Sequence, residues 1–236
     1  MRKTHTILLI SALLILILAG CSPSAQNKEQ QASAGVTNKT PENNASMTTE
    51  ERNALNSAMN YLRVSAFSYD GLIGQLEFEQ FSHEAAVFAA DNCGADWNEQ
   101  AALSARNYLR TSAFSYSGLI YQLEYEGFTT EQATYGVDIC DADWSEQALK
   151  KAKSYLHSSA FSYTGLISQL EHDGFTTEEA THGADNCGAD WNEQAAKKAK
   201  SYLRSGSWSR EKLISQLEYS GFTHEQAVYG AEQNGY

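Results

Sequence analysis

Three cysteines recur at one position of the chain, and a thiol there could form a disulfide, bind a metal or fill a small apolar space. Cys93, Cys140 and Cys187 are spaced by 47 residues. Three is an odd number, and a disulfide between two of them would need Cα atoms within about 7 Å. Only His182 lies near one of these thiols, so the ligands of a metal site are missing. The pattern favours free, buried thiols.

Aspartates flank these cysteines in segments 91–96, 138–143 and 185–190, which superficially resemble calcium-binding loops. A calcium loop of the EF-hand type needs oxygen ligands at alternate positions and a Glu at the twelfth, whereas Cys and Ala stand at alternate positions here. A helix that ends at Gly94 or Gly188, followed by a helix capped by Asp96 or Asp190, explains the residues better. We therefore expect no metal.

No motif of catalytic residues at a characteristic spacing is visible in the sequence. The histidines stand at positions 5, 83, 157, 172, 182 and 224 and do not recur in every repeat. The sequence contains no nucleophile elbow, phosphate-binding glycine loop or zinc-binding histidine pair. Scattered carboxylates are normal on a solvated surface. These absences favour a protein that is not an enzyme.

The N-terminus carries the one cysteine for which a reaction can be assigned. Arg2 and Lys3 precede an apolar run over residues 7–18, too short for a bilayer span of about 20 residues but typical of a signal peptide. The run ends in Leu18-Ala19-Gly20-Cys21, which resembles a bacterial lipobox. This predicts cleavage after Gly20 and a covalent diacylglyceryl lipid on Cys21, with no other cofactor. The alternative is an ordinary signal peptide with a chance cysteine.

The elements that position these residues begin after a polar segment. Residues 21–47 contain almost no large apolar side chain, so we interpret them as a flexible tether with a reach on the order of 25–30 Å. Beyond it, aromatic and leucine anchors such as Tyr61, Tyr108, Tyr155 and Tyr202 return every 47 residues. The domain prediction is a signal peptide (1–20), the lipidated cysteine and tether (21–47), and four repeats (48–95, 96–142, 143–189 and 190–236).

Each repeat is expected to contain three helices. In the second, Asp96 and Glu99 form the expected capping box of the first helix, Ser115 caps the second and Thr129 the third. Gly127 ends the second helix in a left-handed conformation, while the first repeat has Gln80 there and should have a strained or differently shaped turn. The fold class is all-α, a tandem array of four three-helix, helix-turn-helix-like repeats of 47 residues.

The charge decides which partners such helices can meet. The formal net charge is −12, and removing residues 1–20 leaves 15 basic against 29 acidic groups, or −14. The third helix of the second repeat offers Glu131, Thr134 and Asp138 where a DNA-reading helix needs basic side chains. We expect no nucleic acid partner, and the helix-turn-helix geometry is structural.

Carboxylates that recur at the end of the second helix suit a basic, extended or helical partner. Their alternative role is simply to keep the surface soluble. Exposed aromatics such as Tyr121, Tyr125 and Tyr135 either anchor that partner or complete the core. The candidate partner-binding residues are Glu77, Glu79, Glu124, Glu126, Glu171, Asp173 and Glu218.

One repeat unit runs from Ala101 through Ser112-Ala113-Phe114-Ser115, Gln122-Leu123-Glu124 and Gly127-Phe128-Thr129 to Asp143-Trp144. In these residues it resembles the repeat of the host cell surface-exposed lipoproteins, the Ltp-type family of Gram-positive bacteria and their prophages. The resemblance covers residues 48–236. It implies a lipid-anchored protein on the extracytoplasmic face of the cell membrane. It also implies superinfection exclusion, in which prophage-encoded members block DNA entry by engaging the tape-measure protein of another phage.

Gln80, Asp141, Trp208 and Asn234 depart from the family pattern, so not every repeat need bind. The leading hypothesis is a surface lipoprotein that excludes superinfecting phage by capturing an injection protein. The alternative is a cell-envelope lipoprotein that binds cell wall, such as peptidoglycan or another surface polymer, or acts as a spacer.

Overall fold

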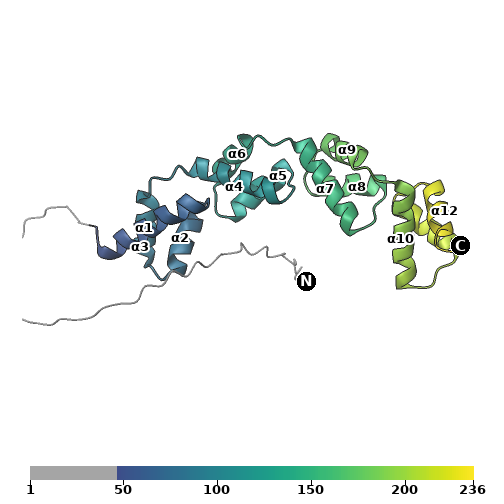
Figure 1. Ribbon diagram of the computed structural model, residues 1–236, viewed down its shortest axis with the longest axis horizontal. Coiled ribbons are helices and arrows are strands. Elements are labelled where there is room, and N and C mark those ends of the chain that lie inside the picture. Colours follow the sequence, from purple (N-terminus) through teal and green to yellow (C-terminus); the bar gives the residue numbers. More distant parts are fainter. Residues whose placement is uncertain (1–46) are drawn as a thin grey trace, which may run out of the picture. The chain divides into compact units, whose positions relative to one another are not determined.

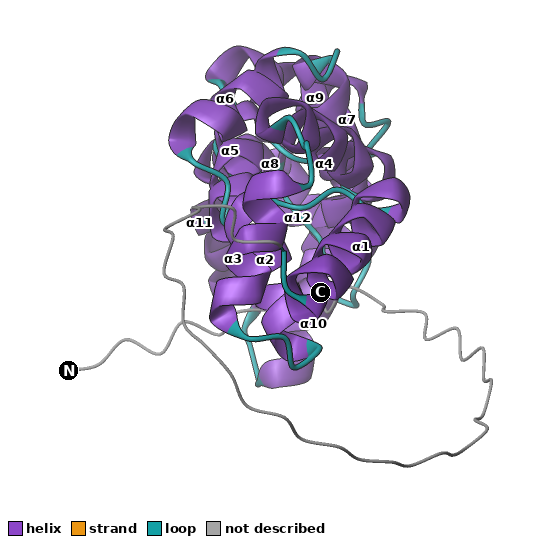
Figure 2. Cartoon of the chain, turned by 90° about the vertical axis from the view of Figure 1, so that its left-hand side faces the viewer, coloured by secondary structure: helices purple, strands orange, loops and turns teal. Residues whose placement is uncertain are grey.

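The computed structural model describes residues 47–236, so the predicted signal peptide, Gly20, Cys21 and the tether lie outside the described residues. Residues 47–236 form twelve helices and no strands, which confirms the all-α tandem repeat (Figures 1 and 2). Each repeat has a longer first helix and two shorter ones. The helices are α1 (Thr49–Val64), α2 (Tyr69–Phe78), α3 (His83–Asn92), α4 (Trp97–Thr111), α5 (Tyr116–Tyr125), α6 (Thr130–Asp138), α7 (Trp144–Ser158), α8 (Tyr163–His172), α9 (Thr177–Asn186), α10 (Trp191–Ser205), α11 (Arg210–Tyr219) and α12 (His224–Glu232).

The helix starts lie where the sequence predicted them. Ser115 accepts a hydrogen bond from the Gly118 amide, and Thr129 forms a full capping box with Gln132. At Asp96 only half of the predicted box forms, because its carboxylate accepts from backbone amides while Glu99 returns no bond. The backbone angle ψ is 108° at Asp96 but 159° at Thr129. This difference turns the backbone amide of Asp96 away from Glu99, the third residue of the helix.

Each repeat builds its own core from the first and third helices. In the second repeat Ala101 and Ala105 of α4 are fully buried against Ala133 and Val137 of α6. A Cβ added at Gly136 would lie 2.6 Å from the carbonyl carbon of Ala101, so the two backbones are in close contact. The small residues allow this approach, and α5 then covers the remaining side of the core through its leucines.

The cysteines belong to these cores. Cys140 is buried just beyond the end of α6, and burial raises the pKa of its thiol. Cys93 and Cys187 are half-buried at the equivalent positions. All three are free thiols, as the sequence indicated.

Successive repeats are joined by recurring contacts, one of which links a helix start to a helix end. Ser115, the cap of α5, donates through Oγ to the carbonyl oxygen of Asp173 in the next repeat at 2.6 Å. The turn that follows, at Gly174, approaches so closely that an added Cβ would lie 2.9 Å from Ser115 Oγ. Trp144 packs edge-on against Tyr116, with ring centroids 5.5 Å apart. Equivalent serine contacts join the first repeat to the second and the third to the fourth.

Gln80 occupies the equivalent turn of the first repeat with φ +71°, which confirms the strained left-handed backbone. The shape of the turn is unchanged, since Phe81 N bonds Leu76 O at 3.2 Å, as Phe128 N bonds Leu123 O. A side chain is accommodated here because no described repeat precedes this turn.

Candidate binding surface

The first row of predicted carboxylates lies at the last turn of each second helix. One carboxylate oxygen of each of these glutamates is hydrogen-bonded to the side chain of the first residue of the third helix. The distance is 2.6 Å from Thr130 Oγ1 to Glu124 and 2.7 Å from His224 Nδ1 to Glu218. The contact fixes the side chain and leaves its charge near solvent. This row consists of Glu77, Glu124, Glu171 and Glu218.

The second row of predicted carboxylates turns back toward the core of its own repeat. Glu126 accepts hydrogen bonds from Tyr108 Oη and, at 2.8 Å, from Ser104 Oγ. Asp173 accepts from Tyr155 Oη in the same way. Burial, followed by these carboxylates, raises the pKa of both phenols above the usual tyrosine range. Glu79, the remaining member, takes the equivalent bond from its own tyrosine. This row is therefore engaged in holding the first and second helices together.

An aromatic side chain stands between the two rows. The exposed fraction is 76% at Phe78, 64% at Tyr125 and 88% at Tyr219, and His172 takes the place in the third repeat. Tyr121, one turn before Tyr125, is also exposed. We refer to the first carboxylate row and these neighbours as the ladder surface: Glu77, Phe78, Glu124, Tyr125, Glu171, His172, Glu218 and Tyr219.

Sequence reasoning identified Tyr121 and Tyr125 as anchors or core residues, and the structure places both on the surface. Tyr135, the third aromatic considered, is also exposed, at 39%. The same reasoning missed Phe78, His172 and Tyr219. The spacing of 47 residues that links them to Tyr125 was a signal that could have found them.

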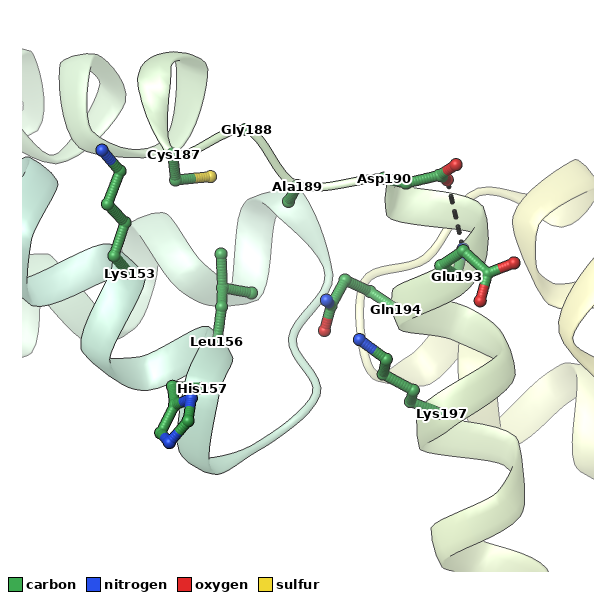
Figure 3. A pocket seen from close by; sticks show the side chains of 10 residues that line it. All are labelled: Lys153, Leu156, His157, Cys187, Gly188, Ala189, Asp190, Glu193, Gln194 and Lys197. Carbon is green, nitrogen blue, oxygen red and sulfur yellow. Dashed lines mark hydrogen bonds between the residues drawn. The ribbon is translucent and has the colours of Figure 1, made fainter.

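Open hollows lie at junctions between repeats. One of about 440 Å³ lies between the third and fourth repeats, where Gln194 and Lys197 extend from α10 toward α7 (Figure 3). In the part of the chain that is described, no group of three His, Cys, Asp or Glu side chains could hold a metal ion.

The fold and this surface define an α-helical repeat protein that presents equivalent side chains once per repeat, as repeat proteins that bind through extended surfaces do. The family model described as "Host cell surface-exposed lipoprotein" matches residues 49–93, 96–139, 143–187 and 190–233. The chain belongs to this family.

The chain is also similar to a solved structure, described as "Structure of Ltp, a superinfection exclusion protein from the Streptococcus thermophilus temperate phage TP-J34". The identity is 32% and the TM-score 0.39, over 40% of this chain and 98% of that one. Comparison with curated proteins gave no match.

The family is not known as one of enzymes, and its description places its members on the host cell surface as lipoproteins. Within residues 47–236, none of the helices has the length and apolar character needed to cross a bilayer.

Proposed function

We propose that the chain is a lipid-anchored protein of the cell surface that acts in superinfection exclusion, by capturing the tape-measure protein of an infecting phage and blocking entry of its DNA. Membership of the family across four repeats supports the surface location. The lipobox at Cys21 supports the anchor. The solved relative, Ltp of phage TP-J34, is described as a superinfection exclusion protein, which supports the activity.

The observation that carries the proposal is the ladder surface. A fixed carboxylate stands beside an exposed ring or imidazole in every repeat, so a partner would meet charge and apolar contact at the same step. Six helices, the second and third of repeats one to three, contain no Lys or Arg, so neither residue type on them competes for these carboxylates. A basic polypeptide with apolar side chains at intervals has the complementary chemistry.

Phage challenge of a sensitive host tests the proposal, with adsorption and DNA entry recorded separately. Cells that express the full chain should adsorb phage normally and block DNA entry. A Cys21→Ala chain, which cannot be lipidated, should protect less. The triple variant Glu124→Gln, Glu171→Gln, Glu218→Gln should lose protection and bind purified tape-measure protein on the order of ten- to a hundredfold more weakly at low salt.

A matched control removes three carboxylates elsewhere. Glu99, Glu146 and Glu193 lie at the first turn of α4, α7 and α10, away from the ladder surface, and their change to Gln alters the net charge equally. This control should protect normally. Equal loss in both triple variants would reduce the effect to net charge, and unchanged DNA entry over a broad phage panel would refute exclusion.

A further inference from the structure

Positive charge is segregated within the repeats. Residues 47–236 contain 13 Lys and Arg residues, and seven of them lie on α7 and α10, the first helices of the third and fourth repeats. An acidic protein therefore carries a local basic surface on a different helix from the ladder surface. Neither the proposed capture of a basic polypeptide nor the fold requires it.

The basic side chains of these two helices divide into two groups. Lys151 lies over the Tyr155 ring and 3.4 Å from Asp173, and Lys198 lies over Tyr202, so both serve their own repeat. The others recur at helical spacings i, i+3 and i+7, which places them on one face. We call this face the basic stripe: Lys150, Lys153 and His157 on α7, and Lys197, Lys200 and Arg204 on α10.

The basic stripe is exposed, and none of its six side chains forms an ion pair within residues 47–236. Basic residues at the equivalent positions become fewer toward the N-terminus. The second repeat has Leu103, Arg106 and Arg110, and Arg106 donates to the Ile139 carbonyl oxygen at 2.9 Å. The first repeat keeps only one cation at these positions. Free positive charge therefore collects on the third and fourth repeats.

The stripe meets two of the pockets at the repeat junctions. Arg110, Lys150 and Lys151 line a pocket of about 400 Å³ between the second and third repeats, and no carboxylate lines it. Lys153, His157 and Lys197 line the pocket between the third and fourth repeats. Each junction thus offers basic groups from two helices around a space large enough for a small anionic group.

The carboxylates of the second pocket are already engaged. Asp190 caps α10 by accepting from the Asn192 and Glu193 amides, and Glu193 accepts from Tyr229 Oη at 3.2 Å. Gln194 borders the same pocket, is 5% exposed, and its Oε1 has no hydrogen-bond partner among residues 47–236. This oxygen is itself shielded from solvent, and the equivalent Gln147 Oε1 likewise has no partner among the described residues, so the groups that this pocket offers to an anion are Lys153, His157 and Lys197.

We propose that α7, α10 and the two junction pockets bind a water-soluble polymer of polyol phosphate, with its phosphates at the basic stripe. Phosphodiesters remain fully charged at neutral pH and suit the point charge of lysine. No large apolar side chain is exposed on α7 or α10, so the stripe lacks the groups that insert into a bilayer. Such a polymer would hold the repeats at the envelope while the ladder surface stays free.

The test measures binding of purified poly(glycerol phosphate) to the full chain in detergent. The double variant Lys153→Gln, Lys197→Gln should bind on the order of tenfold more weakly at low salt, and the affinity of the unmodified chain should fall as salt rises. A control with the same charge change, Arg52→Gln with Arg63→Gln on α1, should bind as the unmodified chain does. Circular dichroism should show unchanged helix content in both.

Absence of binding, or equal loss in both double variants, would overturn the proposal. So would tighter binding to phosphatidylglycerol vesicles or to a DNA duplex at the same phosphate concentration, since the occupant would then be a membrane or a nucleic acid. The triple ladder variant Glu124→Gln, Glu171→Gln, Glu218→Gln should keep polymer binding. This separates the inference from the proposed function.

Discussion

The serine contact between repeats allows a quantitative prediction, because one helix-capping serine contacts the next repeat and another contacts no other repeat. Ser115 caps α5 and also donates to the Asp173 carbonyl oxygen of the next repeat. Ser209 caps α11 through the Lys212 amide but is exposed and reaches no other repeat. Ser209→Ala should cost about 1 kcal/mol for the lost cap. Ser115→Ala should cost about 2–3 kcal/mol, because a carbonyl also loses its donor.

Native-state hydrogen exchange is the suitable assay, since it reports the opening of single helices. The amides of α5 in Ser115→Ala should open roughly five- to thirtyfold more often than the cap loss alone explains. The amides of α11 in Ser209→Ala should show the cap loss only. Equal destabilisation in the two variants would refute the coupling between repeats that we infer from the serine contact.

Three further predictions concern the core. Gly183→Ala should destabilise the third repeat by about 1–3 kcal/mol in urea unfolding, because its Cβ would lie 2.9 Å from the Ala148 carbonyl oxygen; stability equal to or above that of the unmodified chain would contradict this packing. The raised pKa of Tyr108 stabilises the fold fully below pH 10, and this stability is lost as pH rises through the folded-state pKa. Tyr108→Phe should therefore lose less stability than the unmodified chain between pH 9 and 11. Maleimide should label Cys140 more slowly than Cys187, since Cys140 is buried, which raises the pKa of its thiol, whereas Cys187 is half-buried.

The sequence was sufficient for the fold because each repeated residue meets a local physical requirement. Ser115 and Thr129 could be recognised as caps without knowledge of tertiary structure, since both satisfy amides within three residues of themselves. Gly127 was likewise identified from a local backbone requirement, and its φ is +90°. Because these requirements are local, they recur in each repeat of the sequence and can be recognised there.

The site was less predictable because its side chains are oriented by contacts between helices. Glu124 and Glu126 looked equivalent in the sequence, yet Glu126 meets Tyr108, 18 residues earlier, while Glu124 meets only Thr130. The angle between α4 and α5 decides this difference, and a periodic pattern does not specify an angle. For the same reason Tyr125 was compatible with both core and surface until the helix was placed.

Gln80 and Asn234, two of the residues that depart from the repeat pattern, lie in the first and fourth repeats. The turns of the second, third and fourth repeats need Gly because a serine of the preceding repeat lies against each of them, and Gln80 has no such serine nearby. In the fourth repeat Asn234 replaces the thiol and donates to the Ala196 carbonyl oxygen at 3.1 Å, while Tyr236 Oη donates to the Trp208 carbonyl oxygen at 2.7 Å.

These departures do not reach the ladder surface, since the first and fourth repeats keep both its acidic and its aromatic members. They alter how a repeat meets its neighbours rather than what it presents to solvent. Whether the atypical repeats bind stays a prediction, and we expect that they do because they keep the ladder residues. A partner of the ladder surface should depend on the outer repeats as well as the inner ones. Binding that survives loss of Glu77 and Glu218 unchanged would contradict this conclusion.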